Sequence, residues 1–304
     1  MTRGSASPNP EFSPSRAPAG PVLVPRRRPR PSPLALWHLL SLDAPSVATV
    51  WTLFLARAAG LRLPWVEPAA MFVAVWMIYA ADRLLDARGL DAPHPSVDGL
   101  EERHRFHHAH RSAFLCGIVA GALALVYLLH HTDDRALHLY ALLAALLAAW
   151  LLVVHASVRS RGQRLPKEIA VGLFFAAAVF IPTVGRLPEL RIELLPSAVL
   201  FAGVCALNCL FLYAWEHPGS RPGAHGSTRW ATAHLDALTA VLIAASGLAA
   251  VTQRGGLGEA PALACGLSAG LLWGLHRMRR RALAVHLRAA ADLVLLTPLL
   301  WLLR

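Results

Sequence analysis

Long apolar stretches separated by polar segments dominate the chain from about residue 44 to its end. Each is close to the roughly 20 residues that a helix needs to cross the hydrocarbon core of a bilayer. The nine stretches lie at about 44–61, 64–82, 112–130, 136–156, 168–185, 195–215, 235–252, 259–276 and 284–303. This pattern predicts an all-α fold, a polytopic membrane bundle of about nine transmembrane helices.

Composition agrees with the pattern. Of 304 residues, 56% are hydrophobic and only 15% are charged, which is less charge than soluble proteins usually carry. Residues 1–33 differ from the rest, because they are rich in Pro, Ser, Gly and Arg and cannot bury enough apolar surface to fold. They also lack the apolar core of a signal peptide. We predict a disordered, Pro/Arg-rich cytoplasmic tail over 1–33 and one transmembrane domain over 34–304.

The formal net charge is +11, but the basic residues lie between the apolar stretches and not in one soluble region. This distribution favours membrane lipid or an anionic substrate as the partner, and not nucleic acid. With the N-terminus in the cytoplasm, 22 of the 29 lysines and arginines fall on the cytoplasmic side. The other seven are Arg57, Arg62, Arg135, Arg186, Arg191, Arg254 and Arg304. The positive-inside rule therefore predicts an odd number of spans, with the C-terminus on the opposite side, in a bacterial inner membrane.

An acidic pair ends the second apolar stretch. Asp82 and Asp86 are four residues apart, so on a helix they lie on one face, where like charges repel. One interpretation is local: Arg83 and Arg88 solvate the pair at the membrane edge. The other is a Mg²⁺ ion, which proteins commonly hold with one or two carboxylates and the phosphates of a substrate. The spacing alone leaves both interpretations open.

Basic and polar residues in other segments extend the second interpretation. Arg103 and Arg105 follow the acidic pair, while Arg161, Arg164 and Lys167 follow the fourth stretch. Arginine side chains match phosphate oxygens, although topology alone also explains such charges.

The sixth stretch carries Asn208, eight residues before Glu216 at its end, and these two share one helical face. Asn208 either bonds to a neighbouring helix or adds to a polar stripe at the same membrane face as the acidic pair.

The two acidic segments resemble those of the UbiA-type intramembrane prenyltransferase superfamily. IYAADRLLD, at 78–86, is similar to the NDxxDxxxD motif of that family, with Asp82 and Asp86 at its last two acids. Ile78 and Tyr79 stand where the family has Asn and the first Asp. YAWEHPGSR, at 213–221, is similar to the start of the second motif, YAxxDxxDD.

In that second segment Tyr213 matches, but Glu216 is the nearest residue to the missing acids, and Asn208 stands for an upstream acid. RGQRLPKEIAVG, at 161–172, resembles the basic, Pro- and Gly-containing entry to the fifth helix of the family. The resemblance covers about residues 36–304 and includes the helix number, the cytoplasmic N-terminus and long loops after the second and sixth helices.

The resemblance implies a Mg²⁺-dependent enzyme that transfers a prenyl group from a prenyl diphosphate to an apolar or aromatic acceptor. Asp82 and Asp86 would be catalytic and, with Glu216, would hold the metal. The diphosphate would contact Arg103, Arg105, Arg161, Arg164, Lys167, Asn208 and Tyr213. Because half of the acids of the family are missing, a non-catalytic lipid-binding or transport protein on the same fold is the alternative. A third interpretation is a protein that contacts other membrane proteins through its basic tail.

Four other features have structural or functional interpretations. Asp43 is predicted to cap the first helix, with Pro45 in its first turn. Asp292 lies within the ninth stretch, where it either pairs with Arg288 or lines a cavity. His104, His107 and His108 either bind a transition metal or belong to a basic helix at the membrane surface. The four cysteines fall inside apolar stretches without metal-ligand spacing.

Overall fold

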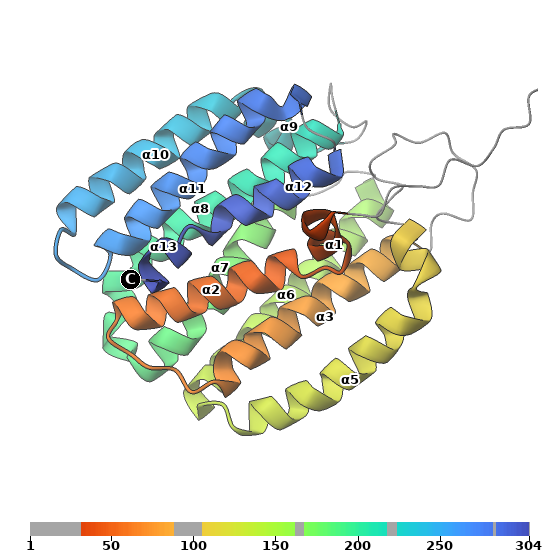
Figure 1. The fold of residues 1–304 in the computed structure, drawn as a ribbon, viewed down its shortest axis with the longest axis horizontal. Helices are drawn as coiled ribbons and strands as arrows, with labels where there is room; N and C mark the ends of the chain where they lie inside the picture. Colours follow the sequence, from red (N-terminus) through yellow and green to blue (C-terminus); the bar gives the residue numbers. More distant parts are fainter. Residues whose placement is uncertain (1–31, 88–104, 162–166, 218–223, 282–283, 304) are drawn as a thin grey trace, which may run out of the picture. The chain divides into compact units, whose positions relative to one another are not determined.

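The computed structural model describes residues 32–87, 105–161, 167–217, 224–281 and 284–303, and the regular structure in these ranges is entirely helical (Figure 1). The side chains of residues 86, 87, 155–161, 167, 281 and 284 lie outside the description. Residues 32–304 form one unit. The α-helices are α1 (Pro33–Leu39), α2 (Asp43–Ala58), α3 (Val66–Ala87), α5 (Arg111–His130), α6 (Asp134–Arg161), α7 (Lys167–Arg186), α8 (Arg191–Glu216), α9 (Gly226–Ala233), α10 (Leu235–Thr252), α11 (Glu259–Met278), α12 (Ala284–Leu293) and α13 (Leu299–Leu302). The 3₁₀ turns are η2 (Pro188–Leu190), η3 (Arg279–Arg281) and η4 (Val294–Leu296).

Among the described residues, six segments are long and apolar enough to cross a membrane. They are Val66–Leu85, Arg111–His130, Asp134–Val154, Glu168–Arg186, Pro188–Glu216 and Leu235–Thr252. A seventh is counted if α1 and α2, which meet at a 90° bend, form one span. The chain is therefore an all-helical membrane protein, as predicted, but the predicted number of nine spans is not confirmed. Each predicted stretch contains helix, and the differences arise in the first, eighth and ninth stretches.

The ninth stretch is broken by a proline. Pro298 has no backbone N–H, so the carbonyl of Val294 four residues earlier loses its helical donor. The hydroxyl of Ser268 on α11 donates to that carbonyl at 3.1 Å. Trp51 of α2 donates its indole N–H to the neighbouring carbonyl of Leu295 at 2.8 Å. Side chains from α2 and α11 therefore satisfy the backbone where the segment divides into α12, η4 and α13, as an apolar interior requires.

The same arrangement recurs at Pro182 inside α7. The carbonyl four residues before it belongs to Ala178, which accepts a hydrogen bond from the hydroxyl of Tyr140 on α6 at 3.3 Å. Thr52 of α2 donates to the adjacent carbonyl of Val179 at 3.4 Å. Because neighbouring helices supply these donors, proline is tolerated inside a span.

We expect Ser268→Ala to lower the free energy of unfolding by about 1–3 kcal/mol, the usual cost of leaving a buried acceptor without its donor. The measurement is thermal unfolding of the purified protein in detergent. Ser246→Ala is the matched control, because the Ser246 hydroxyl is also buried but makes no hydrogen bond to the described residues. Equal stability of the two variants would contradict the role given to Ser268.

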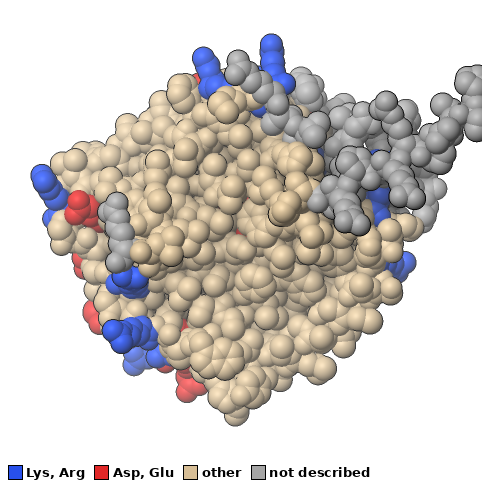
Figure 2. All heavy atoms as spheres, in the orientation of Figure 1, with Lys and Arg blue, Asp and Glu red and all other residues tan. Residues whose placement is uncertain are grey.

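The interior of the bundle is built around α2 and α8. Trp51 of α2 lies against Phe201 of α8, with their ring centroids 4.1 Å apart and both side chains fully buried. By contrast, only 6% of the apolar segment of α6 and 11% of that of α5 are buried within the protein. In the face seen in Figure 2, uncharged residues form a broad central expanse and the described charged residues lie at its edges. Such a surface suits contact with lipid tails.

Candidate functional site: a buried polar cluster

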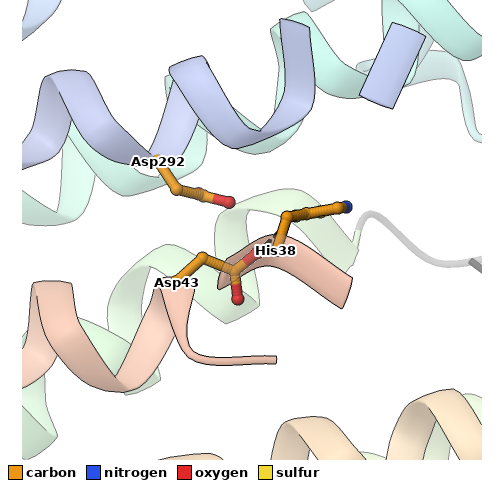
Figure 3. Close-up of side chains that lie close together, drawn as sticks. All are labelled: His38, Asp43 and Asp292. Atoms are coloured by element: carbon orange, nitrogen blue, oxygen red, sulfur yellow. Dashed lines mark hydrogen bonds and ion pairs between the residues drawn. The ribbon is translucent and has the colours of Figure 1, made fainter. Parts of the chain in front are cut away.

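Five polar side chains meet in the interior, and we call them the polar cluster: His38, Asp43, Arg83, Asn208 and Asp292. They come from five helices, α1, α2, α3, α8 and α12. His38, Asp43, Arg83 and Asn208 are buried, and Asp292 is partly buried. Figure 3 shows the side chains of His38, Asp43 and Asp292 converging from their three helices. Charged groups within a membrane protein are costly, so such a cluster is a candidate functional site.

The bend between α1 and α2 brings His38 and Asp43 together. Ser41 in this bend has a φ of 59°, a left-handed conformation that turns the chain sharply. His38 Nδ1 then lies 2.5 Å from Asp43 Oδ2. The other oxygen of Asp43 accepts the N–H of Ala44 at 3.0 Å. Asp43 is the first residue of α2, whose N-cap is Leu42 without a side-chain cap, so the predicted capping role is wrong. Its carboxylate instead holds the imidazole of His38.

Arg83 reaches the same carboxylate from α3. Its Nη2 donates to Asp43 Oδ2 at 3.3 Å, and its Nη1 donates to the carbonyl of His38 at 3.4 Å. The side chain is only 6% exposed. In the local interpretation of the acidic pair, Arg83 solvates it at the membrane edge, whereas the structure places Arg83 in the interior beside Asp43. Successive helical residues are rotated by about 100°, so Asp82, one position earlier, is exposed.

Asn208 and Asp292 form the other half of the cluster. The amide nitrogen of Asn208 donates to Asp292 Oδ1 at 2.9 Å, so Asn208 bonds to a neighbouring helix, as one of its two interpretations proposed. Its amide oxygen is buried and accepts no hydrogen bond from the described residues. Arg288 pairs with Glu216 at 2.7 Å. Of the two predictions for Asp292, an interior position therefore fits better than pairing with Arg288.

The three metal-ligating side chains of the cluster lie close together. One ligand atom from each of His38, Asp43 and Asp292 lies within 4.8 Å of the others. Two carboxylates this close repel each other in a weakly polar interior unless a proton or a cation lies between them. Arg83 supplies one positive charge, and the imidazole of His38 supplies another only when it is protonated. The arrangement can therefore hold a cation or a shared proton.

The predicted site residues are only partly described, and their roles remain predictions. Asp82 and Arg105 are exposed, and Tyr213 and Glu216 are partly buried. Arg103 and Arg164 lie outside the described residues, as do the side chains of Asp86, Arg161 and Lys167. Of the predicted set, Asn208 alone belongs to the polar cluster.

Of the three predicted Mg²⁺ ligands, Asp82 and Glu216 have side chains within the description, and Asp86 does not. Asp82 is exposed on α3, whereas Glu216 on α8 is engaged by the guanidinium of Arg288. A carboxylate held by arginine is already neutralised and makes a poor ligand for a hard cation. We therefore derive no chemical step through Mg²⁺ at these residues.

Sequence reasoning missed His38 and the burial of Arg83. The available signal was local. His38 precedes Asp43 by five residues, with Ser41 between them and Pro45 after them, and these two residues favour a turn into a helix. Comparison with protein-family models, with curated proteins and with solved structures finds no match for this chain. The resemblance to UbiA-type prenyltransferases thus depends on the sequence motifs alone.

Proposed function

We propose that the protein is an integral membrane prenyltransferase of UbiA type, acting on a prenyl diphosphate and an apolar or aromatic acceptor. One observation supports this most: the two helices that carry the motif resemblance, α3 and α8, both direct a polar side chain into one buried cluster. Arg83 of α3 binds Asp43, Asn208 of α8 binds Asp292, and these two carboxylates lie close together. A polar site enclosed by apolar helices suits a substrate with a polar head and a hydrocarbon tail.

The reaction breaks the bond between the allylic carbon and the diphosphate oxygen and forms a new carbon–carbon or carbon–heteroatom bond to the acceptor, which loses a proton. The leaving diphosphate needs positive charge, for which the predicted residues are Arg103, Arg105, Arg161, Arg164 and Lys167. The proton needs a buried base, for which the imidazole of His38, oriented by Asp43, is suited. The experiment below measures whether the reaction depends on Mg²⁺.

The test is release of inorganic diphosphate from prenyl diphosphates by the purified protein, with and without Mg²⁺ and with a panel of aromatic acceptors. We expect Asp292→Asn to reduce the rate by about 100-fold, the usual effect of losing one preorganised charged group in an active site. Asp82→Asn combined with Asp86→Asn tests the predicted metal pair. Asp134→Asn is the control, because Asp134 is exposed at the start of α6. If the control and Asp292→Asn released diphosphate at equal rates, the polar cluster would take no part in the activity.

The second candidate is a non-catalytic lipid-binding or transport protein on the same plan. The ion pair between Glu216 and Arg288 favours it, because it engages the residue nearest to the missing acids of the second motif. This candidate predicts that a prenyl diphosphate or another isoprenoid lipid raises the thermal stability of the protein by mass action without release of diphosphate. Release above the level of control membranes would rule it out.

A further inference from the structure

We infer that the polar cluster is a binding site for a first-row divalent metal ion, with His38, Asp43 and Asp292 as ligands. This site differs from the acidic motif of the second apolar stretch. It shares His38 and Asp292 with the proposed function, but binding of the ion requires no prenyl substrate. The ligands are drawn from α1, α2 and α12, so a bound ion would join three helices.

The spacing of the three side chains suits a metal. Ligand atoms at about 2.0–2.2 Å from one ion lie roughly 3–4 Å from each other. The three candidate atoms all lie within 4.8 Å of one another. His38 Nδ1 and Asp43 Oδ2 are already in hydrogen-bond contact at 2.5 Å, so a bound ion would replace the proton that this pair shares. His38 and Asp43 are held in place by their mutual contact and by the bend at Ser41. A largely preformed ligand set lowers the cost of ordering the site upon binding.

An independent observation points to a cation at the same place. The amide oxygen of Asn208 is buried without a hydrogen-bond donor from the described residues, although the nitrogen of the same amide bonds to Asp292. A buried carbonyl oxygen without a partner costs free energy. Because the nitrogen of the same amide bonds to Asp292, this oxygen lies close to that carboxylate, and it is a ligand type that divalent ions accept. We therefore assign Asn208 as the fourth protein ligand.

The charge balance of the cluster favours binding of a cation. Metal binding requires His38 to be neutral. Arg83 then opposes the negative charge of the two carboxylates. Both of its contacts with the cluster are long, at 3.3 and 3.4 Å. A site with one imidazole nitrogen, carboxylate oxygens and an amide oxygen favours Zn²⁺, Mn²⁺, Fe²⁺ or Co²⁺ over Mg²⁺, which prefers oxygen ligands alone.

The experiment uses the full chain, purified in detergent, treated with a chelator and then freed of it. Zn²⁺, Mn²⁺ and Co²⁺ are titrated without any prenyl compound, so that failure of the proposed function does not affect the result. The readouts are metal per chain by elemental analysis, the shift of the thermal midpoint, and visible absorption of bound Co²⁺. The variants are His38→Gln and Asp292→Asn. His108→Gln is the matched control, because His108 is exposed.

We expect the wild-type protein and His108→Gln to bind one ion per chain, and both cluster variants to bind it at least about tenfold more weakly. The chain has 15 histidines, so the variants must separate the cluster from surface sites. The inference is overturned if the wild type binds no metal, or if the cluster variants bind as tightly as the control does. Should either variant fail to fold, Asn208→Ala replaces it, because it removes a ligand without removing a charge, and the same tenfold loss is expected.

Discussion

Replacing Arg83 with Met is expected to lower the free energy of unfolding by about 3–5 kcal/mol, the usual cost of removing one partner of a buried ion pair. The guanidinium of Arg83 lies against Asp43, whose side chain is only 1% exposed. Without Arg83, His38 becomes the nearest source of positive charge for this carboxylate. The measurement is reversible unfolding in mixed detergents, monitored by the loss of helical circular dichroism.

Arg135→Met is the matched control for this prediction, because Arg135 is exposed on α6 and its loss is expected to change stability by less than about 0.5 kcal/mol. The double variant Arg83→Met with Asp43→Leu removes both charges and should recover part of the lost stability, since a buried pair often costs as much as it contributes. If Arg83→Met is as stable as Arg135→Met, Asp43 does not depend on Arg83 for its charge balance.

Replacing Gly172 with Val is expected to destabilise the protein by about 3 kcal/mol or more, at the upper end of the cost of inserting carbon atoms into a packed interior. A Cβ at Gly172 would lie 2.5 Å from the carbonyl oxygen of Ala202 and 2.9 Å from the backbone nitrogen of Ala206. Both contacts are to the backbone of α8, so no side chain can move aside. Helices α7 and α8 would have to separate, and α8 carries Asn208 of the polar cluster.

Gly247→Val on α10 is the control, because a Cβ there meets nothing within 4 Å. Thermal unfolding in detergent compares the two variants, and binding of metal or of a prenyl diphosphate reports whether the cluster is displaced. We expect Gly247→Val to remain within about 1 kcal/mol of the wild type, given the helix preferences of Gly and Val. A similar loss in both variants would mean that the loss reflects helix preference and not close packing.

The apolar pattern was sufficient to predict the long helices, but not the short helices α1 and α9. Because a bilayer requires every backbone polar group to be bonded within its own segment, a stretch of about 20 apolar residues has few alternatives to helix. Breaks of the helix within those stretches were harder to predict from the sequence. Pro182 and Pro298 are similar in sequence terms, yet one lies inside the continuous helix α7 and the other follows a 3₁₀ turn.

The second apolar stretch shows where sequence reasoning reached its limit. Its final turns contain Asp82, Arg83 and Asp86, and the spacing identified the acids as partners on one face. Which residue faces the interior depends on the rotation of α3 against α2, and this rotation places Arg83 beside Asp43. The packing of α5 contributes, because Gly117 and Gly121 leave room for Trp76 and Met77 of α3. No local pattern encodes that rotation.

What the sequence by itself determined is therefore the membrane class, the all-helical fold class and the approximate position of each long apolar helix. The tertiary structure decided which charges are buried together: Asp43 meets Arg83 across 40 residues, and Asn208 meets Asp292 across 84. The physical reason is the distance along the chain over which each interaction is specified. Hydrophobicity acts on each segment against its solvent, whereas an isolated charge inside a bundle is tolerated only when a particular side chain from another helix arrives beside it.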